Sequence, residues 1–163
     1  MAVAFATGVV IGAAIALLSA LAVTKFQLRR HRKALASALV GEIAAIVREI
    51  ECRDVVEQLR RATDRLQVSL TCLPPRPYPV FEAEAGRLDR LAAPLPRKIA
   101  FFYTRMGALA EDVRSFADGE LRGTEYLQPL LGELEATMSL SDEVLRDLRE
   151  VANPSPLHLL GRA

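Results

Sequence analysis

An uninterrupted apolar run at the start of the chain constrains its architecture most. Residues 2–23 read AVAFATGVVIGAAIALLSALAV, with no charged residue and no proline. As an α-helix this run would extend roughly 33 Å at about 1.5 Å per residue, enough to cross the hydrocarbon core of a bilayer. We therefore predict a single transmembrane helix over residues 1–24.

A basic segment, residues 25–33, follows this run and predicts its orientation. Positive charge gathers on the cytoplasmic side of a membrane span, so the N-terminus is expected outside and the C-terminal domain in the cytoplasm, with a bacterial inner membrane as the location. A cleaved signal peptide is the alternative, since Ala20–Ala22 resembles a cleavage site, but signal peptides carry their positive charge before the apolar run. The basic positions are Lys25, Arg29, Arg30, Arg32 and Lys33.

The charge balance of the remainder argues against nucleic acid as a partner. The chain has 21 basic and 20 acidic residues. Setting aside the five basic residues of 25–33 leaves 16 against 20, whereas binding to phosphate backbones needs a basic surface. The bilayer is the partner expected for the basic segment. In the cytoplasm Cys52 and Cys72 stay reduced, and their spacing forms no metal motif; in an exported domain they would suit a disulfide.

Apolar residues at helical spacing predict a bundle beyond the basic segment. Long helices are expected over residues 32–67, from Pro96 to Asp118 and from Thr124 to Asn153. The fold class is therefore all-α: one transmembrane helix, then an antiparallel three-helix bundle with a short connecting helix. The bundle domain covers residues 34–153, and residues 154–163 form a tail. The predicted core positions are Leu35, Leu39, Ile43, Ile46, Ile50, Ile99, Phe102, Met106, Leu109, Val113, Phe116, Leu127, Leu134, Met138, Leu145 and Leu148.

The connecting helix is predicted in the segment YPVFEAEAGRLDRL, residues 78–91. Pro79 suits the first turn of a helix. Phe81, Ala85 and Leu88 share one face, which predicts their burial, and Gly86 favours a kink. We interpret this segment as an element that closes the core.

Enzyme motifs are absent from the sequence. His31 and His158 lie far apart, and there is no glycine-rich phosphate loop or metalloprotease motif. Glu82 and Glu84 stand two positions apart, so on a helix they point to different sides. No catalytic residue, metal or cofactor is expected.

Two groups of residues suggest contacts with other proteins. Small residues recur every fourth position in the apolar run, a spacing that lets two membrane helices approach closely; this possible dimer face is Gly8, Gly12, Ala16 and Ala20. Aromatic residues gather in two short stretches, either as core packing or as a patch that binds a partner. They are Tyr78, Phe81, Phe101, Phe102 and Tyr103.

A membrane span followed by EIAAI, YPVFEAEAGRLDRL and KIAFFYTRM resembles an uncharacterised family of bacterial single-pass membrane proteins with a short helical cytoplasmic domain. The similarity covers roughly residues 5–115. It implies the same architecture and assigns no catalytic residue.

These features predict a membrane-anchored cytoplasmic helical module that binds other proteins, itself included, without catalysis. A regulatory or signal-transmitting subunit of a membrane complex is the first alternative. A membrane-associated enzyme that uses unidentified carboxylates is the second. An unknown protein partner and a homodimer both remain open.

Overall fold

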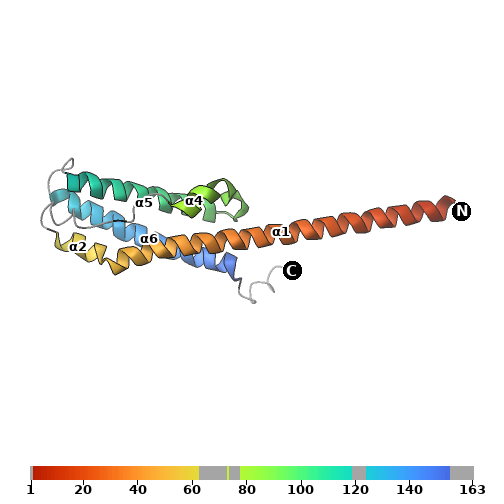
Figure 1. Ribbon diagram of the computed structural model, residues 1–163, viewed down its shortest axis with the longest axis horizontal. Coiled ribbons are helices and arrows are strands. Elements are labelled where there is room, and N and C mark those ends of the chain that lie inside the picture. The colour runs from red at the N-terminus through yellow and green to blue at the C-terminus, as the bar shows by residue number, and fades with distance from the viewer. Residues whose placement is uncertain (1, 63–72, 74–77, 119–123, 155–163) are drawn as a thin grey trace.

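The computed structural model describes residues 2–62, 73, 78–118 and 124–154, and the side chains of residues 2–15, 117 and 124 lie outside that description. Every regular element in the described residues is helical, so the all-α prediction is confirmed for them. Figure 1 shows a bundle at one end and a single long helix projecting from it. The longer elements are α1 (Ala2–Cys52), α5 (Leu95–Asp118) and α6 (Leu127–Ala152).

Helix α1 is unbroken for 51 residues, from the apolar run through the basic segment into the bundle. Its second half supplies one wall of the core, because Leu39, Ile43 and Ile50 are fully buried there. No helix among the residues that the structure describes is long and apolar enough to cross a membrane. The predicted span lies largely in residues 2–15, whose side chains are outside the description.

The predicted helix over residues 32–67 is interrupted after Cys52, which corrects that expectation. Asp54 adopts a left-handed backbone conformation, with φ of 52°, and α2 (Val55–Arg61) starts directly after it. Three or four positions beyond Ile50, a continuous helix would turn Arg53 and Asp54 toward the core. The break lets Val55 take that place instead, and it is fully buried. Aspartate tolerates the left-handed conformation better than most residues.

Helix α6 is the central element of the bundle. It packs against α1, α5 and α2, and Figure 1 shows it running antiparallel to both α1 and α5. A helix with neighbours on two sides needs a wide buried face. Accordingly Thr137 and Ser141 are buried although neither was predicted in the core, while the predicted Met138 is only partly buried. Both hydroxyls donate to carbonyls of their own helix, which removes the cost of burying them.

The connecting segment forms α4 (Pro79–Glu84) and then a 3₁₀ turn, η1 (Ala85–Arg90). Pro79 occupies the first helical turn as predicted, and the helix changes character at Ala85, next to Gly86. Leu88 is buried, but Phe81 is only partly buried and Ala85 is exposed. The prediction that these three share one buried face is therefore wrong, because the tighter 3₁₀ winding rotates the second half of the segment relative to the first.

Ion pairs fasten the bundle on its outside. The Lys98 ammonium lies 2.8 Å from a carboxylate oxygen of Asp147, which joins α5 to α6. This contact raises the pKa of Lys98. Arg60 of α2 lies 2.7 Å from Glu135 of α6. Ion pairs that remain accessible to solvent contribute little each, so burial of the apolar residues holds the bundle together.

Candidate functional site, a groove along helix α1

A groove of about 540 Å³ runs along α1 beside the start of α4. Its volume lies within the range usual for ligand sites. On the α1 side it is lined by four small residues, called its floor below, together with Glu42, Ile46 and Glu49. Tyr78, Pro79 and Val80 form the opposite wall. The floor residues are Ser37, Ala38, Gly41 and Ala45.

Gly41 is the feature of this floor that the fold itself does not need. It lies inside a long helix, where glycine costs roughly 0.5–1 kcal/mol relative to alanine. A Cβ atom added at Gly41 would meet nothing within 4 Å, so no neighbour in the bundle requires the missing side chain. What the glycine does provide is a shallow surface on α1 that another backbone can approach closely.

One carboxylate joins three elements at the edge of the groove. Glu42 of α1 accepts hydrogen bonds from the backbone N–H groups of Val80 at 2.7 Å and Phe81 at 3.0 Å. It also accepts one from the Tyr103 hydroxyl of α5 at 2.6 Å. The first N–H groups of a helix have no partner within that helix, and no side chain of α4 caps them. Glu42 therefore acts as the cap of α4 from a different helix.

The predicted aromatic residues meet at this same point, with one exception. The Phe81 and Tyr103 rings stack with centroids 4.1 Å apart, Tyr78 lies 5.1 Å from Tyr103, and Phe102 contacts Tyr103 edge-on. Burial, and then the bond to Glu42, raise the pKa of Tyr103 well above its usual value. Tyr103 thus stays protonated as a hydrogen-bond donor. Phe101 lies apart, 51% exposed, with the Arg105 guanidinium over its ring.

The polar groups of this cluster are occupied in holding α1, α4 and α5 together. The Glu42 carboxylate already accepts three hydrogen bonds, and a tyrosine held in its protonated form is a poor general base. Among the described residues no group of histidine, cysteine or acidic side chains could hold a metal ion. Cys52 is the last residue of α1 and is exposed, and Cys72 lies outside the described residues.

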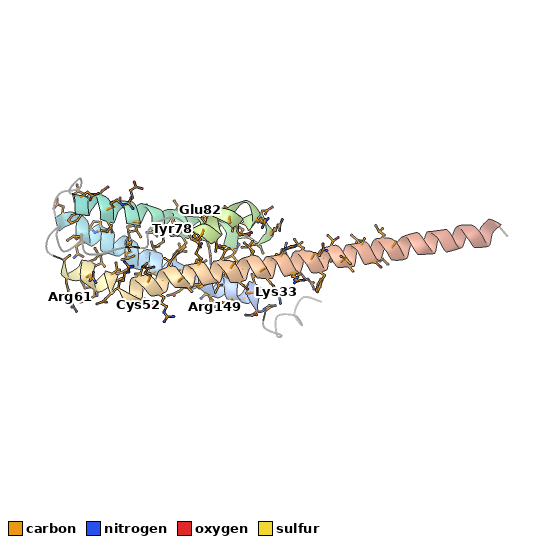
Figure 2. The ribbon with its side chains drawn as sticks, viewed as in Figure 1. Lys33, Cys52, Arg61, Tyr78, Glu82 and Arg149 are labelled. Carbon is orange, nitrogen blue, oxygen red and sulfur yellow. The ribbon has the colours of Figure 1, made fainter. Side chains whose placement is uncertain are left out.

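The other predicted residues lie on the part of α1 that leads up to the bundle. Gly8 and Gly12 fall in the part whose side chains are not described, while Ala16 and Ala20 are exposed. The basic residues of 25–33 are exposed, and no ion pair involves them within the described part of the chain. Figure 2 shows Lys33 near the end of the bundle from which α1 projects, with Cys52 and Arg61 toward the opposite end.

Sequence reasoning missed the small-residue floor, although a signal for it exists. Ser37, Gly41 and Ala45 repeat the four-residue spacing of Gly8, Gly12 and Ala16 at an offset of 29 positions. At 3.6 residues per turn this offset is about eight whole turns. Because α1 is unbroken, both triplets occupy the same side of one helix.

No protein-family model, curated protein or solved structure matches this chain. The resemblance to bacterial single-pass membrane proteins therefore stays a prediction, and the fold is described on its own structural terms.

Replacement of Glu42 tests whether its carboxylate secures α4. Hydrogen bonds to charged groups contribute about 1.5–3 kcal/mol, so Glu42→Ala is expected to lower the free energy of unfolding by about 2–3 kcal/mol. Glu42→Gln should lower the free energy of unfolding by less, because the amide keeps one acceptor oxygen. It should still be less stable than the unaltered chain, because its NH₂ group faces a donor. Hydrogen exchange at the amides of Val80 and Phe81 should accelerate in both variants. Glu49→Ala is the control, since Glu49 lines the same groove but forms an exposed pair with Arg53. Equal losses for Glu42→Ala and Glu49→Ala would contradict this role.

Proposed function

We propose that this protein is a membrane-anchored helical module without catalytic activity, whose cytoplasmic bundle binds other proteins. Its first partner is a second copy of the same chain, bound along the groove side of α1. The observation that carries this proposal is the set of exposed apolar side chains on the part of α1 beyond the bundle, from Leu17 to Phe26.

The exposed side chains of that half favour a membrane as its surroundings. Leu17, Leu18 and Phe26 are 63%, 65% and 67% exposed. At about 100° per residue, Leu18 and Val23 point to well-separated sides of the helix, and Val23 is also exposed. A helix that is apolar all round needs an apolar surrounding on every side. The bundle covers none of these four side chains, and a bilayer would cover all of them.

The basic segment supports the orientation. Its five positive residues form no ion pair with any described residue, so their charges are available to anionic lipid headgroups. Each such charge near the surface contributes about 1 kcal/mol. This arrangement favours the bundle on the cytoplasmic side, as the positive-inside rule predicts.

The shared side of the two small-residue triplets supports a second copy as the partner. Two copies anchored in one membrane point the same way, so a parallel pair brings each triplet opposite its own counterpart. Gly12 would then mark the contact within the membrane and Gly41 the contact beside the bundle. A face made of small residues favours close packing of helix backbones.

A signal-transmitting subunit is the second candidate, favoured by the unbroken course of α1. A rigid helix that passes from the apolar run into the core can carry a rotation or shift from the membrane to the bundle. This role is compatible with self-association and differs in requiring two arrangements of the helix.

The membrane anchor is tested by placing charge in the apolar half of α1. Arginine inside a membrane helix costs up to about 2.5–3.5 kcal/mol, so the double variant Leu17→Arg/Leu21→Arg should be largely released from membranes by alkaline carbonate. Phe101→Arg, which adds charge at an exposed apolar site of the bundle, should be retained like the unaltered chain. A reporter fused after Ala163 should be active only in its cytoplasmic form. Retention of the double variant would contradict the membrane anchor, and a periplasmic reporter signal would contradict its orientation.

The self-association face is tested by three matched glycine replacements. Gly12→Ile and Gly41→Ile should each weaken dimers of the full chain in lipid nanodiscs or a membrane reporter assay, by about tenfold or more in dissociation constant. Gly132→Ile is the control, because Gly132 is also an exposed helical glycine with nothing within 4 Å of an added Cβ. Helix propensity rises in all three variants, so unfolding does not explain a loss confined to two of them. Equal association of the Gly41 and Gly132 variants would exclude the groove from the interface.

A further inference from the structure

A second, smaller cavity lies between α1 and η1. It has a volume of about 240 Å³ and is lined by His31 of α1 and by Arg87 and Arg90 of η1. Ala34, Leu35 and Ala38 form its apolar side. The volume is below the range of about 300–1,000 Å³ usual for drug-sized ligands, so it suits a single functional group better than a peptide segment.

The charges around this cavity are only partly balanced. Glu84 is the one acidic residue that lines it, and its carboxylate is engaged by Arg87, with oxygen–nitrogen distances of 3.0 and 3.2 Å. Arg90 is half-buried and forms no ion pair with any described residue. A half-buried guanidinium without a carboxylate partner is a strong donor for an incoming anion.

The arrangement of donors fits a phosphate group. Guanidinium groups present a planar fork that matches the oxygens of phosphate. Two arginines from one turn and an imidazole from the facing helix supply donors from two sides. The apolar side leaves the rest of a ligand free to extend along α1.

The position of the cavity suggests where such a phosphate comes from. His31 lies within the basic segment, eight residues after Val23, or about 12 Å along a helix. If α1 is anchored as proposed above, the cavity stands just outside the headgroup layer, which is roughly 5–8 Å deep on each side of the bilayer. A lipid headgroup and a free phosphate compound would both present the same chemistry.

We propose that the cavity formed by His31, Arg87 and Arg90 binds a phosphate group, supplied by an anionic lipid headgroup or by a soluble phosphate compound. The position next to a headgroup layer rests on the proposed membrane anchor, whereas phosphate binding itself rests only on the cavity. Binding joins η1 to α1 through the ligand and so couples the connecting segment to the membrane-proximal end of the bundle.

Two binding measurements on the full chain separate the sources. In detergent micelles, inorganic phosphate is titrated while the Arg90 side-chain N–H signal is followed by NMR. In nanodiscs of phosphatidylcholine, the same signal is followed as phosphatidic acid is introduced at increasing fractions. The structure predicts saturable shifts of this signal in at least one arm. Saturation in the lipid arm alone identifies a headgroup, and saturation in both identifies a general phosphate site. The absence of saturation in both arms overturns the proposal.

Variants distinguish a built site from diffuse attraction, with binding followed by phosphorus NMR. Arg90→Gln should weaken phosphate binding at least tenfold, which corresponds to the loss of a charged hydrogen bond. Arg90→Lys should weaken it less, because the charge is kept and the fork is lost. Lys33→Gln removes a positive charge from the same end of α1 without touching the cavity, so it should leave the micelle arm unchanged. Equal effects of Arg90→Gln and Lys33→Gln in micelles would overturn the proposal. Because the micelle arm needs no membrane insertion, a failed anchor would leave its result intact.

Discussion

The unbroken course of α1 is the constraint on which the rest of the structure depends. One helix of 51 residues carries the apolar run, the basic segment and one wall of the core. The part of α1 that carries the apolar run and the part that lies in the bundle are therefore fixed in rotation relative to each other. The groove, its glycine floor and the small-residue positions of the apolar run consequently lie on one side of the molecule. The proposal of a second copy as the partner rests on that geometric fact.

Glu42 holds in place the element that closes the bundle between α1 and α5. Since α6 packs against α1 and α5 and these two run parallel, another element must close the space between them. The connecting helix α4 does so, but it is too short to be stable alone. Glu42 supplies acceptors for two of its first N–H groups and for Tyr103 of α5. The groove wall that α4 forms is thereby held at a defined place along α1.

Periodicity in the sequence was sufficient to predict the helices but not their connections. The stripes from Ile99 to Phe116 and from Leu127 to Leu148 identify α5 and α6 because burial of one face imposes helical spacing. The break at Asp54 moves the buried position by one residue, from Asp54 to Val55. The spacing of the apolar residues around it indicates this shift only weakly. The Glu42 contacts join residues about forty to sixty positions apart, and no local pattern reports such pairing. The partial burial of Phe81 likewise depends on where α4 lies against Tyr103.

A distance along α1 tests the central claim most directly. The natural Cys52 is exposed, so it can carry one spin label in a Cys72→Ser background, with a second label at Ser19→Cys. For the protein in a lipid bilayer, a continuous helix places these two positions about 50 Å apart at 1.5 Å per residue. Electron–electron double resonance, at label densities low enough to isolate single chains, should show a narrow distribution near that value. A broad distribution at clearly shorter distances would mean that α1 bends or breaks between the apolar run and the bundle, which contradicts the account.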